Sequence, residues 1–217
     1  MGKITAIEPQ KRNPQRVNIY LDGEFAFALS RLVAAWLRVG EELSAEKIAS
    51  LKAADTREQA LQYALRLISY RARSERELCQ RLEQKGWDQT VIQETLDRLR
   101  QNGLLDDLQF AQNWIENRQT FRPRSARLLR QELRQKGLDE QTIQQALKEL
   151  DEEAAAQALA RRQAQRLKGA PARLFHQKLI AHLVRRGFSY ELASTVSQNL
   201  WEELHDETNT HSQNSED

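Results

Sequence analysis

The sequence contains a single cysteine, Cys79, so no disulfide can form within the chain. It has only eight glycines and four prolines, and no apolar run of the roughly 18 residues that suggests a membrane span. Its first residues, MGKITAIEPQK, lack the apolar core of a signal peptide. These absences, with much Leu, Ala, Gln, Arg and Glu, predict a helical protein of the reducing cytoplasm without a membrane partner.

Motifs for catalysis are also missing. We find no phosphate-binding glycine loop, no HExxH, no nucleophile elbow and no cysteine cluster. His176 and His182 would lie on opposite sides of a helix, which argues against a metal site. We interpret Cys79 as a packing residue rather than a nucleophile. We therefore expect no catalytic residue, cofactor or metal, and an enzyme is the least favoured class.

What the chain does contain is a threefold repeat of about 50 residues. Ser74 to Leu99 aligns without a gap with Ser125 to Leu150, and more weakly with Phe175 to Leu200. In each copy two leucines precede a glycine at helical spacing, a cation comes directly before that glycine and a bulky apolar residue directly after it. The glycines are Gly86, Gly137 and Gly187; the leucines are Leu78 and Leu82, Leu129 and Leu133, and Leu179 and Leu183.

This pattern predicts two consecutive helices in each copy. Leucines four apart share one helix face, the glycine supplies a left-handed C-cap, and the cation complements the helix dipole. Asp88, Asp139 and Ser189 then provide N-caps for a second helix. Upstream patterns at 55–70, 106–119 and 151–167 supply a third helix for each copy, the first with a capping box at Asp55 to Glu58.

The fold class that follows is mainly α, with three tandem three-helix units that resemble helix-turn-helix motifs and form an elongated curved array. We place these units at 55–103, 104–150 and 151–203. Residues 204–217 are polar and acidic, and we expect them to be disordered. Residues 1–54 differ: Asp22-Gly23 between alternating apolar residues predicts a β-hairpin, KITAIE can pair as a third strand, and 31–38 and 44–53 read as short helices. This extension is either a structural lid or a partner-binding element.

Positive charge is concentrated in two segments, although the formal net charge is only +2. Arg118 to Lys136 holds seven cations and one acid, and Arg161 to Arg186 holds eight cations and no acid. Such rows are either solvated helix faces or surfaces for nucleic acid or acidic protein. Arg127, Arg130 and Arg134 would share one helix face, extended by the preceding loop. The candidate binding residues are Arg118, Arg122, Arg124, Arg127, Arg130, Arg134, Lys136, Arg161, Arg162, Arg166, Arg173, Lys178, Arg185 and Arg186, with Lys168 beside them.

Several strings in order resemble the RecX family of bacterial recombinase regulators. These are RARSERELCQRLEQKG, GLLDDLQFAQNWIENR, RPRSARLLRQELRQKGL and LVRRGFSYE, which lie between about residues 55 and 203, while ITAIEPQKRNPQRVNIYLDGEFAFALS resembles the N-terminal extension of longer members. The third copy departs most, because Phe175 replaces the serine found at Ser74 and Ser125.

The resemblance implies a modulator of homologous recombination, DNA repair and the SOS response. RecX proteins bind in the groove of the RecA–DNA filament and suppress strand exchange, ATP hydrolysis and co-protease activity without catalysis of their own. The expected partners are therefore the RecA filament and the DNA within it, bound by a monomer. Two alternatives from other classes stay open: a helix-turn-helix protein that binds DNA directly, and a helical-repeat scaffold for protein–protein interactions.

Overall fold

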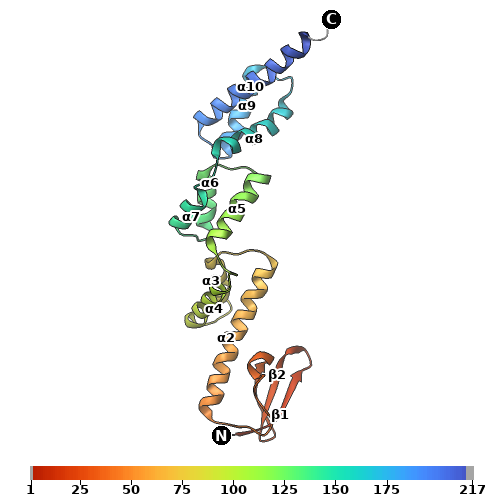
Figure 1. The fold of residues 1–217 in the computed structure, drawn as a ribbon, viewed down its shortest axis with the longest axis vertical. Helices are drawn as coiled ribbons and strands as arrows, with labels where there is room; N and C mark the ends of the chain where they lie inside the picture. The colour runs from red at the N-terminus through yellow and green to blue at the C-terminus, as the bar shows by residue number, and fades with distance from the viewer. Residues whose placement is uncertain (1, 214–217) are drawn as a thin grey trace. The chain divides into compact units, whose positions relative to one another are not determined.

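The computed structural model describes the backbone of residues 2–213 and the side chains of residues 2–205. It divides into two compact bodies between Leu105 and Asp106. The N-terminal body contains a small sheet and the first three-helix unit, and the C-terminal body contains the second and third units (Figure 1). The fold is mainly helical with a small antiparallel sheet, as the sequence predicts.

The sheet confirms the predicted hairpin and third strand. Its strands are β1 (Gly2–Gln10), β2 (Asn13–Leu21), β3 (Glu24–Ser30) and the short β4 (Glu42–Leu43), in the order β3-β2-β1-β4. All neighbouring strands are antiparallel. At the turn between β2 and β3, Asp22 and Gly23 both have positive φ angles, of 50° and 90°. This is the conformation of a type I′ turn, which matches the right-handed twist of the two strands.

One long helix joins the sheet to the first three-helix unit, where two helices were expected. Helix α2 runs from Ala45 to Tyr70, and the short α1 (Arg31–Ala34) precedes β4. The N-cap of α2 is Ser44, whose hydroxyl accepts a hydrogen bond from the amide of Lys47. No glycine or proline interrupts the segment, so one helix passes through residues 54 and 55, and the expected break between two helices there is wrong. Figure 1 shows α2 beside β2 at one end and near α3 and α4 at the other.

The predicted capping box at Asp55 is also wrong, because this residue lies inside α2 and is only 4% exposed. Its carboxylate accepts hydrogen bonds from the guanidinium of Arg16 on β2 (2.9 Å), from the amide of Ser30 (2.6 Å) and from the side chain of Gln59 (2.7 Å). Asp55 therefore attaches the sheet to the helix instead of starting a helix.

The repeated helix pairs form where the pattern places them. They are α3 (Glu75–Glu83) with α4 (Gln89–Gln101), α6 (Ala126–Gln135) with α7 (Glu140–Leu147), and α9 (Ala172–Arg185) with α10 (Tyr190–Gln213). The six repeated leucines before the glycines are all fully buried. Gly86, Gly137 and Gly187 have φ angles of 86°, 87° and 90°, and the residue after each donates its amide to the carbonyl five residues back. This is the Schellman C-cap that the sequence predicts.

The third helices come from upstream, as expected. They are α5 (Asp107–Phe121) for the second unit and α8 (Glu152–Ala164), continued by the 3-10 turn η1 (Gln165–Leu167), for the third. Asp106 and Asp151 cap them through their carboxylates. Each three-helix unit thereby encloses its own cluster of buried apolar side chains.

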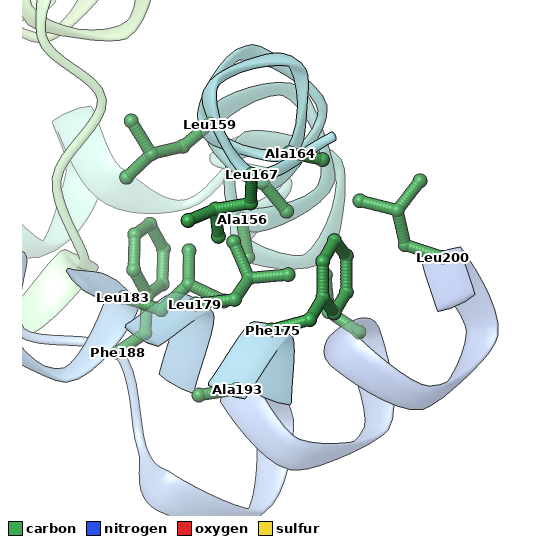
Figure 2. Close-up of a cluster of buried hydrophobic side chains, with 12 residues drawn as sticks. Ala156, Leu159, Ala164, Leu167, Phe175, Leu179, Leu183, Phe188, Ala193 and Leu200 are labelled. Atoms are coloured by element: carbon green, nitrogen blue, oxygen red, sulfur yellow. The ribbon is translucent and has the colours of Figure 1, made fainter. Parts of the chain in front are cut away.

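The third unit begins its middle helix one turn earlier than the other two. In the first two units the N-caps are Ser74 and Ser125, each fully buried. In the third, α9 starts after Pro171, and Phe175 lies inside the helix at 2% exposure. Figure 2 shows Phe175 directed into a core with Leu179, Leu183 and Phe188. The loss of the capping serine is therefore accompanied by a larger apolar side chain in the core.

Residues 204–217 were expected to be disordered, but the backbone of α10 continues to Gln213. The segment from Tyr190 onward contains no glycine or proline, so nothing in the sequence ends the helix after the core residue Leu200. Residues 214–217 lie outside the described part of the chain.

Candidate functional site

Three of the candidate cations are engaged inside the second three-helix unit. The carboxylate of Glu132 on α6 accepts hydrogen bonds from the indole of Trp114 (2.7 Å), from Arg118 (2.8 Å) and from Arg124. The guanidinium of Arg118 and the ammonium of Lys136 also lie 4.4 Å and 4.9 Å from the Trp114 ring centroid. Arg118, Arg124 and Lys136 therefore stabilise the contact between α5 and α6.

On the outer face of α6, the predicted row of arginines is partly neutralised. Arg130 and Arg134 both lie against Glu140, the first residue of α7, with nitrogen-to-oxygen distances of 3.1 Å and 2.7 Å. Arg127, which belongs to the same row, is exposed and forms no ion pair in the described residues. Arg122, in the loop before α6, is likewise exposed and without an ion pair among the described residues. Of the three arginines in the row, Arg127 is therefore the one whose charge is not offset by a neighbouring carboxylate in the described residues.

The two basic segments of the sequence meet inside the C-terminal body. The amide of Ser125, the N-cap of α6, donates a hydrogen bond to the carbonyl of Arg186, at the C-terminal end of α9 (3.1 Å). Arg162 on α8 reaches the carbonyl of Thr120 near the end of α5 (3.2 Å). These contacts bring the end of α9 to the beginning of α6, so cations that are far apart in sequence lie near one junction.

The end of α9 is itself strongly positive. Burial, and then the neighbouring charges of Arg186, Arg185 and Arg166, lower the pKa of His182 below its ordinary value. No acidic residue occurs between Arg161 and Arg186. Among the described side chains, this segment forms one ion pair, between Arg161 and Glu203 (2.8 Å). Seven of the fourteen candidates form no ion pair, side-chain hydrogen bond or ring contact among the described residues, and we call them the junction cations: Arg122, Arg127, Arg166, Arg173, Lys178, Arg185 and Arg186. Arg173 is the outlier in position, because it lies at the start of α9 and Arg186 follows the end of that helix.

Two exposed aromatic rings flank these cations in sequence and were missed by sequence reasoning. Phe121, the last residue of α5, is 71% exposed directly before Arg122. Tyr190, the first residue of α10, is 70% exposed just after the turn at Gly187. The only signal for them in the sequence is their position at helix ends, where a side chain is less often drawn into the core.

Two further features bear on metal binding and on nucleophilic chemistry. No group of three or more His, Cys, Asp and Glu residues among them is arranged to hold a metal ion. Burial, followed by the hydrogen bond to Glu83, raises the pKa of the Cys79 thiol, which disfavours the reactive thiolate. Across residues 2–213, no helix has both the length and the apolar character needed to cross a membrane.

Comparison with known families covers most of the chain. Four RecX family models match in order: the N-terminal domain at residues 2–44, and the first, second and third three-helix domains at 60–99, 106–147 and 151–196. The family division thus reproduces the sheet and the three repeated units.

Individual relatives give the same result. A protein of Bacillus licheniformis named Regulatory protein RecX is 34% identical over 91% of this chain and 77% of its own length. A protein of Clostridioides difficile with the same name is 31% identical over 92% of this chain and 96% of its length. A solved structure described as regulatory protein RecX is 30% identical, covers 91% of this chain and all of its own, and superimposes with a TM-score of 0.71.

The structure of RecX from Lactobacillus salivarius shares the fold over 68% of this chain, with a TM-score of 0.60 at 24% identity. Because the family's N-terminal domain and all three of its helical domains are matched, and because relatives at 30–34% identity align over more than nine-tenths of the sequence, this chain belongs to the RecX family of regulatory proteins.

Proposed function

We propose that this protein inhibits the RecA recombinase by binding in the groove of the RecA–DNA filament. In this role it suppresses strand exchange, ATP hydrolysis and co-protease activity, and it acts in the bacterial cytoplasm by binding rather than by catalysis. The names of its relatives support a regulatory role. The single observation that supports the binding surface is the junction where Ser125 joins Arg186 and the two basic segments meet.

The charge state of the junction cations supports binding to an anionic polymer. A filament on DNA presents phosphates at regular intervals, and a protein that neutralises them releases condensed counterions. Cations without an internal ion pair are available for that exchange without first breaking another contact. The junction cations meet this condition, whereas Arg118, Arg124, Arg130, Arg134 and Arg161 already have carboxylate partners.

The proposal therefore separates the fourteen sequence candidates into the seven junction cations and seven residues with partners inside the protein, namely the five paired arginines, Arg162 and Lys136. The junction cations would contact the filament. The paired arginines would hold the helices in place and contribute to binding mainly through the shape of the surface. Arg162, whose guanidinium is bonded to a backbone carbonyl, would keep α8 close to α5.

The test is a charge reversal on the junction with a control of equal net charge. The variant carries Arg122→Glu, Arg127→Glu and Arg185→Glu, three exposed positions of the C-terminal body. The control carries Lys11→Glu, Lys47→Glu and Arg76→Glu, three exposed positions of the N-terminal body. We expect the variant to lose inhibition of RecA strand exchange and the control to keep it, with circular dichroism unchanged in both.

The salt dependence of filament binding gives a second measure. Each phosphate contact that is lost should reduce the slope of log affinity against log salt by about one. The triple variant should therefore show a slope smaller by about three if all three residues contact phosphate. Tight binding to naked DNA without RecA, lost in the same variant, would instead favour direct DNA binding.

A further inference from the structure

A cleft of about 660 Å³ opens in the N-terminal body, away from the junction cations in sequence and in a different body. Its walls come from the start of β2, from the end of β3 with α1, from one face of α2 and from the turn between α3 and α4. The side chains that give it chemical character are Tyr63 and Arg66 on α2 and Lys85 and Trp87 in the turn. The cleft is thus built by parts that the sheet and the first three-helix unit contribute together.

Two aromatic rings line the cleft side by side. The Tyr63 and Trp87 ring centroids are 5.3 Å apart, with the ring planes at 44°. Trp87 follows the glycine of the first repeat, and the residues at this position in the other repeats, Leu138 and Phe188, are 5% and 2% exposed. Trp87 is partly exposed and borders the cleft. In the first repeat the side chain after the glycine therefore faces the cleft, whereas in the other two repeats it is buried.

The charge available in the cleft is positive. Its one acidic residue, Glu58, accepts a hydrogen bond from Gln62 (2.8 Å) and lies 3.7 Å from Arg98. Arg16 is likewise occupied by Asp55. Arg66 and Lys85 are exposed and form no ion pair in the described residues. The ammonium of Lys85 lies 5.7 Å from the Tyr63 ring centroid, so cation and ring are adjacent.

We propose that this cleft binds single-stranded nucleic acid, with an unpaired base stacked on Trp87 and Tyr63 and the flanking phosphates held by Lys85 and Arg66. Single-strand sites combine aromatic stacking with cations that follow the backbone. A duplex keeps its bases stacked on each other and offers no ring face to Trp87. A peptide of acidic residues would use the two cations but has no aromatic ring to stack on Trp87 and Tyr63. The site needs no RecA, so it stands independently of the proposed function.

The experiment uses the full chain, two fluorescent probes and no RecA. One probe is oligothymidylate of about 15 nucleotides, and the other is an oligomer of the same length in which each nucleotide keeps its sugar and phosphate but lacks the base. Both carry the same phosphates, so only the first can stack. All variants are made in a background that reduces nucleic-acid binding by the C-terminal body, namely Arg122→Glu, Arg127→Glu and Arg185→Glu. Fluorescence anisotropy gives the affinity for each probe.

In this background we expect oligothymidylate to bind more tightly than the abasic oligomer. Trp87→Ala should weaken oligothymidylate binding about tenfold and leave abasic binding unchanged. Trp87→Phe should keep most of the affinity, because it keeps a stacking ring and helps to preserve the packing. Lys85→Glu should weaken both probes. Trp36→Ala, at a site 90% exposed outside the cleft, is the control and should change neither.

Equal affinity of the two probes, or oligothymidylate binding that is unchanged in Trp87→Ala, would overturn the proposal. A labelled polyglutamate peptide whose binding is lost in Lys85→Glu, with both nucleic-acid probes binding that variant normally, would overturn it as well. The occupant of the cleft would then be an acidic peptide. Thermal unfolding of each variant verifies that the body is folded at the assay temperature. The two proposals fail separately. The junction variant should lose RecA inhibition but still bind oligothymidylate more tightly than the abasic oligomer, whereas Trp87→Ala should lose this preference.

Discussion

Gly187 lies so close to Ser125 that a β-carbon at position 187 would be 2.4 Å from the Ser125 hydroxyl oxygen. The same atom would be 2.6 Å from Cγ of Leu128, so the turn after α9 has no room for a side chain where it meets α6. With the hydrogen bond from Ser125 to Arg186, this contact joins the second and third three-helix units. It is therefore the structural basis of the junction on which the proposed function depends.

Replacing Gly187 with alanine should destabilise the C-terminal body. The backbone at Gly187 has φ of 90°, which alone costs alanine about 1 kcal/mol. Displacing Leu128 and Ser125 adds about 1–3 kcal/mol, as overpacking does in other cores. The free energy of unfolding in urea, followed by circular dichroism, measures the sum.

Gly86→Ala is the matched control, because Gly86 has nearly the same φ, 86°, but a β-carbon there would meet nothing within 4 Å. It should cost only the backbone strain, about 1 kcal/mol. If the two variants lose the same stability, the close approach of Gly187 to α6 does not exist in solution.

Glu132→Ala should destabilise the second three-helix unit by about 3 kcal/mol, because it leaves three hydrogen-bond donors without their acceptor. The side chain of Glu132 is 13% exposed, and that of Arg118 is 27% exposed. Urea unfolding followed by tryptophan fluorescence reports on this unit when the other three tryptophans are replaced by phenylalanine, because the indole of Trp114 donates to Glu132.

Glu140→Ala provides the comparison. Glu140 also contacts two arginines, but its side chain is 52% exposed, so solvent screens the interaction and the loss should stay below about 1 kcal/mol. Equal losses at the two positions would contradict the structural role assigned to Arg118 and Arg124.

The stability of the third unit should fall as the pH is lowered through the ordinary titration range of histidine. Burial and three nearby arginines lower the pKa of His182 in the folded state. Between that value and about 6.5 the unfolded chain binds more protons than the folded one, so protonation favours unfolding. Melting temperatures between about pH 8 and pH 5 should therefore decrease more in the wild type than in His182→Gln.

An NMR titration of the His182 ring verifies the direction of the shift. A midpoint above that of histidine in a short peptide would contradict the prediction, since the nearby arginines would then not act on this ring. Parallel melting curves for the wild type and His182→Gln would contradict it as well.

Cys79 should react slowly with iodoacetamide in the native protein. Burial raises the pKa of its thiol, and its sulfur lies 3.5 Å from a carboxylate oxygen of Glu83. The thiolate fraction near neutral pH is consequently below that of an exposed cysteine. Mass spectrometry of the alkylated protein should show faster modification in urea than in buffer. Equal rates in the two would indicate an exposed, reactive thiol.

The repeated elements were predictable from the sequence because their determinants are local. Two leucines at helical spacing, a glycine and a capping residue specify each helix end, and the structure places Gly86, Gly137 and Gly187 in the left-handed region as the pattern requires. The hairpin at Asp22-Gly23 follows from local turn chemistry in the same way. Neither depends on knowing the tertiary contacts.

The errors arose where a distant residue decides the outcome. Asp55 resembles a helix N-cap in sequence, but its partner is Arg16, which is brought to it by the sheet. Likewise Arg124 and Arg127 look equivalent in a basic segment, and only the position of Glu132 distinguishes the paired residue from the free one. Sequence alone could count the cations but could not tell which of them already have partners.

The most direct test of the proposed function is the ATPase activity of RecA on single-stranded DNA, measured against increasing concentrations of this protein. We predict that the wild type and the Lys11→Glu, Lys47→Glu, Arg76→Glu control inhibit hydrolysis with similar midpoints, and that both midpoints rise as salt is increased. The Arg122→Glu, Arg127→Glu, Arg185→Glu variant should leave ATP hydrolysis close to its uninhibited rate. Inhibition by that variant at the wild-type midpoint, with folding intact, would contradict the assignment of the junction cations as the filament-binding surface.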